Sequence, residues 1–143
     1  MEKNITFKFT EKNFANPNQM QALTLAYIGD SIYDIMSREY VMKNHLGKIN
    51  DLHKTVSTIV SARAQASFME NILSNGILTE QEEKIYNRAK NQKNNSKAKN
   101  ASIMEYKLAT GLEAVFGYLY LEKNFERLEE MFNYIIRLYE EKQ

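Results

Sequence analysis

Glycine and proline, the residues that most readily interrupt a helix, are scarce in this chain. Its 143 residues include five glycines and one proline, whereas strands joined by tight turns need such residues often. Several segments instead repeat apolar residues every three or four positions, which is the spacing of one helix face. We therefore expect an all-α fold of six or seven helices without a sheet. A chain of this length can form one domain, covering residues 1–143.

Capping residues predict where these helices begin. Asn16 before Pro17 is a typical helix start, and this first helix is expected to run to about Lys43 with an apolar face of Leu23, Ile28, Ile32, Ile35, Met36 and Tyr40. Later starts are expected near residue 50, after Ser61, at the capping box Thr79–Glu82, near Ile103 and after Asn124. The polar stretch 91–101 has no apolar period and is expected to be a loop or a frayed helix end.

The chain contains no cysteine. Disulfides and thiolate metal sites are therefore excluded, which fits a reducing cytoplasm. Residues 1–13 have no apolar stretch typical of a secretion signal, and no apolar run approaches the roughly 20 residues of a membrane span. We expect a cytoplasmic protein that does not contact a membrane.

Two carboxylates stand alone in apolar helical segments. Asp30 is the only charged residue between positions 17 and 33, and Glu113 is the only one between 108 and 121. An unpaired ionised carboxylate in a buried helix costs several kcal/mol or forces protonation. A bound divalent cation would compensate both charges, and Mg²⁺ prefers carboxylate oxygen and water. The alternative is that each acid pairs with a buried arginine, lysine or tyrosine.

Two glycines lie close to these acids in the sequence. Gly29 and Gly111 each fall within two residues of one acid, inside a segment expected to be helical, where glycine costs about 1 kcal/mol relative to alanine. Close approach of another helix or of a ligand would explain both. Asp34 lies one helical turn beyond Asp30. It either supports a metal through water, or is a solvated edge residue or the partner of Arg38.

The segments around both acids resemble ribonuclease III. Leu-Ala-Tyr-Ile-Gly-Asp-Ser-Ile-Tyr (25–33) is similar to the signature helix of that family, and Ala-Thr-Gly-Leu-Glu-Ala-Val-Phe-Gly-Tyr-Leu-Tyr-Leu (109–121) is similar to its second acidic helix. Between them, Leu-His-Lys (52–54) and Val-Ser-Ala-Arg-Ala-Gln-Ala (60–66) resemble the connecting helices of the Mini-ribonuclease III branch. The resemblance covers about residues 17–140.

The resemblance implies a Mg²⁺-dependent endoribonuclease that cleaves double-stranded RNA as a homodimer. Asp30 and Glu113 would be the catalytic, metal-binding residues, and Tyr27 would contact the partner subunit. The alternative for Tyr27 is that it packs in the core of its own subunit as an aromatic residue. The Mini branch lacks a separate double-stranded-RNA-binding domain and is associated with maturation of 23S ribosomal RNA precursor. We therefore expect that this protein has no separate double-stranded-RNA-binding domain and that its substrate is a 23S ribosomal RNA precursor.

The sequence departs from full-length ribonuclease III at three acidic positions. Ala26 and Leu23 replace acids four and seven residues before Asp30, and Thr110 replaces an aspartate three residues before Glu113. Two of the usual metal-site carboxylates therefore remain, as in the Mini branch. The number of bound metals is left open by this pattern.

Positive charge is concentrated in the basic segment 84–107, although the net charge of the chain is only +1. In the absence of an RNA-binding domain, this segment would bind RNA phosphates; the alternative is a solvated loop. His53, beside Lys54, could contact phosphate, but a histidine in such a position is more often a surface or helix-packing residue. The expected RNA-binding residues are Arg88, Lys90, Lys93, Lys97, Lys99 and Lys107.

Two other functions fit the sequence. One is a non-catalytic RNA-binding or ribosome-assembly protein with a ribonuclease III-like fold, for which the three missing acids argue. The other is a structural helical bundle whose core acids are paired internally. The first predicts no Mg²⁺-dependent cleavage of duplex RNA, and the second predicts no RNA binding at all.

Overall fold

The computed structural model describes residues 3, 6–9, 16–92 and 101–143. Within these ranges the chain is helical and contains no strand, so the expected all-α fold is confirmed. The elements are a short 3-10 helix, η1 (Pro17–Gln19), and six α-helices: α1 (Ala22–Asn44), α2 (Ile49–Val60), α3 (Ala62–Ser74), α4 (Glu80–Lys90), α5 (Ile103–Leu121) and α6 (Phe125–Glu141).

Side-chain caps begin α3, α4 and α6 where the sequence predicted them. The Ser61 hydroxyl and the Asn124 side chain each accept a hydrogen bond from a backbone N–H in the first turn of the following helix. Thr79 and Glu82 form the predicted capping box. Each cap satisfies donors that the first helical turn leaves unpaired. Local sequence therefore sets these boundaries.

The predicted start of the first long helix was wrong. Asn16 is an N-cap, but it caps η1, and α1 begins only at Ala22 because the backbone is extended at Met20. The guanidinium of Arg88, on α4, donates hydrogen bonds to the backbone oxygens of Asn18 and Met20. This contact from a distant helix stabilises the interruption, which local sequence could not predict.

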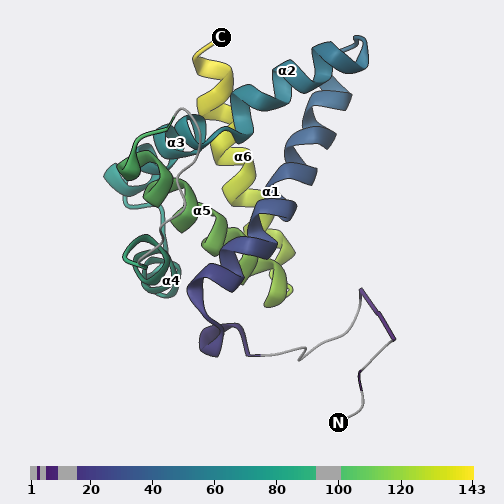
Figure 1. The fold of residues 1–143 in the computed structure, drawn as a ribbon. Helices are drawn as coiled ribbons and strands as arrows, with labels where there is room; N and C mark the ends of the chain where they lie inside the picture. The colour runs from purple at the N-terminus through teal and green to yellow at the C-terminus, as the bar shows by residue number, and fades with distance from the viewer. Residues whose placement is uncertain (1–2, 4–5, 10–15, 93–100) are drawn as a thin grey trace.

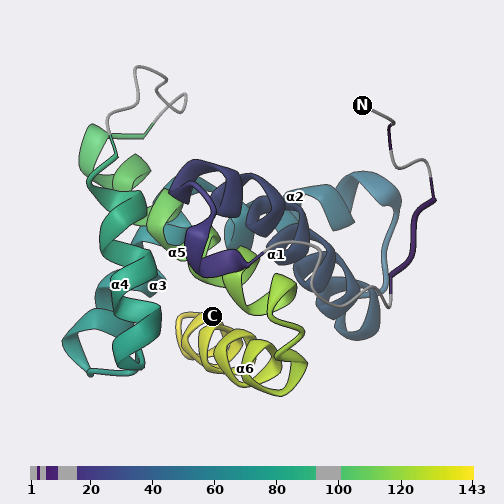
Figure 2. The ribbon, with the colours of Figure 1, turned by 90° about the horizontal axis from the view of Figure 1, so that it is seen from below.

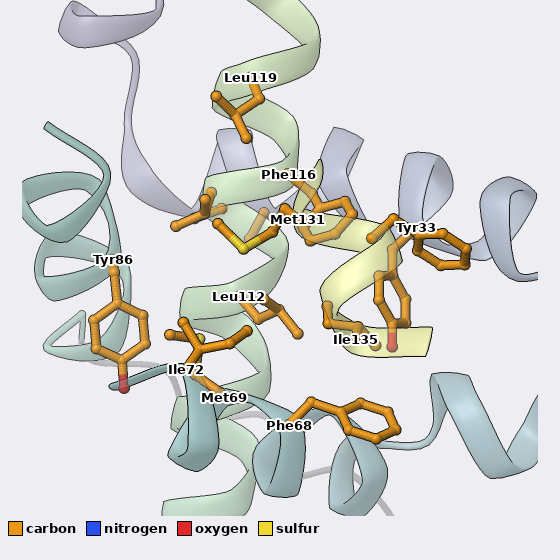
Figure 3. Close-up of a cluster of buried hydrophobic side chains, with 14 of the residues drawn as sticks. Tyr33, Phe68, Met69, Ile72, Tyr86, Leu112, Phe116, Leu119, Met131 and Ile135 are labelled. Carbon is orange, nitrogen blue, oxygen red and sulfur yellow. The ribbon is translucent and has the colours of Figure 1, made fainter. Parts of the chain in front are cut away.

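Helix α5 lies at the centre of the fold. It packs against α1, α3, α4 and α6 (Figures 1 and 2), and nearly every residue from 108 to 119 is buried, as expected of a helix that is apolar all round. Leu112 and Phe116 of α5 meet side chains of the surrounding helices in the core (Figure 3). Across the part of the chain that the structure describes, no helix is both long enough and apolar enough to cross a membrane.

Helix α1 has two apolar faces, and the sequence reading selected residues at the edge of the core. Ile28 and Ile32 are half-buried and Ile35 is 55% exposed. The chain thus buries a different stripe of α1, and part of the predicted one faces solvent. The residues that pack fully into the core are Ala22, Leu25, Ala26, Gly29, Tyr33, Ser37 and Val41.

A buried ion pair joins α4 to α6. Glu82 is 2% exposed, and Arg127 donates to its two carboxylate oxygens at 2.8 and 2.9 Å. Arg127 also donates to the backbone oxygen of Ile77 at 2.8 Å. The bidentate geometry compensates the charge of Glu82 in the core.

Candidate functional site

Glycines bring α1 and α5 into backbone contact. A Cβ atom added at Gly29 would lie 1.7 Å from the backbone oxygen of Glu113, and one added at Gly117 would lie 1.9 Å from the backbone oxygen of Leu25. Each helix therefore needs a glycine for the other to approach this closely. Gly111 likewise accommodates the ring of Tyr86, which would be 2.4 Å from an added Cβ. The expectation of a close helix approach at Gly29 and Gly111 is confirmed.

This crossing places Asp30 beside Glu113. The two carboxyl groups are close enough to share a hydrogen bond when one is protonated. Glu113 is partly buried, whereas Asp30 is exposed in the single chain. The expectation that both acids lie in largely buried helices therefore holds for α5 but not for α1. Gly29 of α1 meets the backbone of α5, whereas the neighbouring Asp30 remains exposed.

Burial, the negative charge of Asp30 and a hydrogen bond to Asp30 raise the pKa of Glu113 to about 8, against a smaller lowering by a hydrogen bond from Gln65. Two adjacent carboxylates cannot both ionise freely when one is desolvated. A bound cation would therefore stabilise the ionised form of both carboxylates.

No cation of the described residues compensates this pair. Among the described residues, the arginine and lysine ion pairs involve other acids, and neither Asp30 nor Glu113 has a cationic partner. Glu82 shows how this chain pairs a buried acid when the role is structural. Among the described residues, the alternative of pairing with a buried arginine or lysine is therefore not seen, and the hydroxyl of the buried Tyr33 donates to the backbone oxygen of Ile59 instead.

The donor set fits a hard divalent cation. Two carboxylates converge, and within the described ranges no group of three or more His, Cys, Asp or Glu side chains forms a fuller ligand cage. Mg²⁺ commonly binds through one or two carboxylates and retains several waters. The residues present match that pattern better than they match a zinc or calcium cage.

One further side chain donates a hydrogen bond to Glu113. The buried Gln65 donates through Nε2 to Oε2 of Glu113 at 3.3 Å. Tyr33 is buried in the core (Figure 3), where its burial and then the charge of Glu113 raise the pKa of its hydroxyl. That hydroxyl donates to the backbone oxygen of Ile59 at 2.9 Å. Tyr33 therefore remains a neutral donor.

Gln65 was not identified as a site residue from the sequence, but a signal was present. Phe68, Met69 and Ile72 follow it at helical spacing and are buried on one face of α3. Gln65 therefore occupies a core position of an amphipathic helix. A polar side chain there must find partners inside the protein, and Glu113 is one of them.

The other acid and aromatic residue of α1 have separate environments. Asp34 forms an ion pair with Arg38 at 2.9 Å, which is the alternative that the sequence allowed. Tyr27 is 81% exposed, so it is not a core residue of the single chain. Its predicted role at a subunit contact stays a prediction.

The predicted RNA-binding residues are only partly described. Arg88 is exposed and contacts η1, while Lys90 and Lys107 are half-buried. Lys93, Lys97 and Lys99 lie outside the described residues. Their common role stays a prediction.

Other basic side chains lie on α2 and α3. His53 and Lys54 are exposed on α2. Arg63, in the first turn of α3, is exposed and forms a 3.6 Å ion pair with Glu105.

Comparisons with known proteins identify relatives over most of the chain. Residues 23–124 match the family described as "Ribonuclease III domain". A protein of Enterococcus faecalis named "Mini-ribonuclease 3" is 45% identical over 83% of this chain and 90% of its own length. A protein of Clostridium tetani with the same name is 46% identical over 94% of this chain and 86% of its own. A crystal structure of a Fusobacterium nucleatum protein matches with a TM-score of 0.73 and 32% identity, covering 89% of this chain and 98% of that one.

Proposed function

The chain belongs to the Mini-ribonuclease 3 group of the ribonuclease III family, and from this we propose that it cleaves double-stranded RNA with Mg²⁺ held by Asp30 and Glu113. Membership of the family makes it an endoribonuclease, which hydrolyses phosphodiester bonds. The contact between two carboxylates that have no described cationic partner carries the proposal of a metal site. Family membership also disfavours the two non-catalytic interpretations.

The side chains of the site would divide the work of the reaction. Bound Mg²⁺ would supply an activated water and neutralise charge on the phosphoryl oxygens. Asp30 is exposed, so its carboxylate can approach a phosphate of a bound duplex. Gln65 donates a hydrogen bond to Glu113, and this bond limits the directions in which the Glu113 carboxylate can point.

We propose that the RNA duplex is gripped by the basic segment, namely Arg88, Lys90, Lys93, Lys97, Lys99 and Lys107. Phosphate contacts would position the duplex without reading its bases. The resemblance of the sequence to the Mini branch favours a 23S ribosomal RNA precursor in the cytoplasm as the natural substrate.

We also propose that the enzyme is a homodimer joined through α1. Tyr27, Ile35 and Met42 are 81%, 55% and 65% exposed, and their spacing places them within about one quarter of the helix circumference. An exposed apolar stripe of this kind is typical of a protein interface. Asp30 lies roughly 60° around the helix from Tyr27, so the interface would run beside the carboxylate pair.

The test is cleavage of a long RNA duplex by wild type, Asp30→Asn and Glu113→Gln, with Mg²⁺ or a chelator. Wild type should cleave only with Mg²⁺, and both variants should lose cleavage while keeping their helical circular dichroism and duplex binding. Asp51→Asn, at the opposite end of α2 from the site, is the control and should remain active. Near-normal cleavage by either site variant would refute the metal assignment.

A further inference from the structure

Gln65 lies at a junction of three helices directly beside Glu113. It is the fourth residue of α3 and is 2% exposed. Its Nε2 donates to the backbone oxygen of Val60, the last residue of α2, at 2.9 Å, and to Oε2 of Glu113 on α5 at 3.3 Å. One amide group therefore ties the end of α2 to the carboxylate of Glu113.

The orientation of this amide is determined by its neighbours. The backbone oxygen of Val60 and an ionised carboxylate can only accept hydrogen bonds. Exchanging the amide nitrogen and oxygen would turn Oε1 of Gln65 toward two acceptors. In the observed orientation both contacts are donated by Nε2, and the buried Oε1 has no partner among the described residues. An unpaired buried acceptor destabilises the fold, so a glutamine at this position needs a reason beyond capping α2.

The need of the Glu113 carboxylate for a hydrogen-bond donor supplies that reason. Among the described residues, the groups hydrogen-bonded to its carboxylate are Asp30 and Gln65. Asp30 repels Glu113 when both are ionised, which is the state that binds a cation. Gln65 is then the neutral donor that keeps the Glu113 carboxylate at the site.

We propose that Gln65 is a positioning residue that orients Glu113 and thereby sets the affinity of the site for a divalent cation. The proposal rests on the proposed function, because it concerns the same carboxylate pair. Gln65 would act through Glu113 and not on RNA. Its loss should change the metal dependence and kcat, and should leave the KM for RNA nearly unchanged.

Tyr33 provides a matched control. Its hydroxyl donates to the backbone oxygen of Ile59, the residue before Val60, so it caps the same end of α2. It makes no hydrogen bond to Glu113 among the bonds described. Tyr33→Phe therefore removes a buried hydrogen bond at this helix end without releasing the carboxylate.

The experiment compares wild type, Gln65→Met, Gln65→Leu and Tyr33→Phe as full-length proteins. The thermal unfolding midpoint is measured without RNA over a Mg²⁺ titration, and duplex cleavage is then measured over the same Mg²⁺ range. Loss of a group that orients a metal ligand typically costs 10–100-fold in metal affinity or activity. Both Gln65 variants should need about tenfold more Mg²⁺ for half of the thermal shift and for half-maximal cleavage. Tyr33→Phe should lower the metal-free midpoint but leave both Mg²⁺ requirements at the wild-type value.

Each outcome decides the proposal. Wild-type Mg²⁺ requirements in folded Gln65 variants would overturn it, and so would failure of both variants to fold when Tyr33→Phe folds, since Gln65 would then be purely structural. The proposed function fails separately. In that case wild type shows no Mg²⁺-dependent cleavage, or Asp30→Asn cleaves normally.

Discussion

Replacing Gly29 with alanine is expected to impair catalysis more than stability. The added Cβ would lie 1.7 Å from the backbone oxygen of Glu113, against 3.4 Å or more for an ordinary contact. Because the obstructing atoms belong to the backbone of α5, no change of rotamer relieves the clash, and the helices must separate by about 1.7 Å, the difference between 3.4 and 1.7 Å. Overpacking of this kind costs about 1–3 kcal/mol or more, offset by about 1 kcal/mol of helix propensity.

The net loss should lower the thermal midpoint by up to roughly 8 °C in a domain of this size. The same separation moves Asp30 away from Glu113. A displacement of about 1 Å between reacting groups can cost about 100-fold in rate. We therefore expect kcat on duplex RNA to fall about 100-fold at a temperature where the variant remains folded.

Two other glycines serve as controls for this variant. Gly111→Ala meets only the ring of Tyr86, so it should cost stability without separating the acids. Gly47→Ala meets the side chain of Asp51 at 3.4 Å and should be nearly neutral. If Gly29→Ala keeps wild-type kcat, or loses no more activity than Gly111→Ala at equal stability, the helix crossing does not set the geometry of the site.

Three further predictions concern charge and assembly. The pKa of Glu113 is raised from 4.5 to about 8 in the fold, so the metal-free fold binds the proton of Glu113 more tightly than the unfolded chain does. The free energy of unfolding therefore falls as the pH rises through this range. Between pH 6 and 8 it should fall by about 2 kcal/mol more in wild type than in Glu113→Gln. Urea unfolding in chelator measures this, and parallel pH profiles would contradict it. Replacing Lys93, Lys97 and Lys99 together with alanine should raise the KM for duplexes of any sequence and flatten the salt dependence of KM, with kcat little changed. An unchanged salt dependence would mean that other residues bind the RNA phosphates. Tyr27→Glu should shift sedimentation at micromolar concentration from dimer to monomer, and an active wild-type monomer would refute the proposed interface.

Local signals predicted the helices of this fold well, and contacts between distant segments explain the exceptions. Ser61, Thr79 and Asn124 cap helices as expected because a cap depends on residues within one turn. The start of α1 was missed because Arg88 stabilises an extended backbone at Met20. The core face of α1 was misread for a different reason: this helix is apolar on two faces, and spacing alone does not say which face meets α5.

The acids of the site were found because each stands alone among apolar residues, which is a property of the sequence. Their contact was not derivable from spacing. It depends on Gly29 and Gly117 meeting across two helices. Gln65 was overlooked since its partner is 48 residues away in sequence, although its core position on α3 was a usable signal.

The ion pair between Glu82 and Arg127 bears on how the chain can acquire its structure during synthesis. Glu82 emerges from the ribosome well before Arg127, which lies 45 residues further on. Until α6 arrives, the start of α4 carries a carboxylate with no counter-charge, and burying it would cost several kcal/mol. The growing chain therefore keeps this corner hydrated, and the core closes around it only when the last helix has been translated.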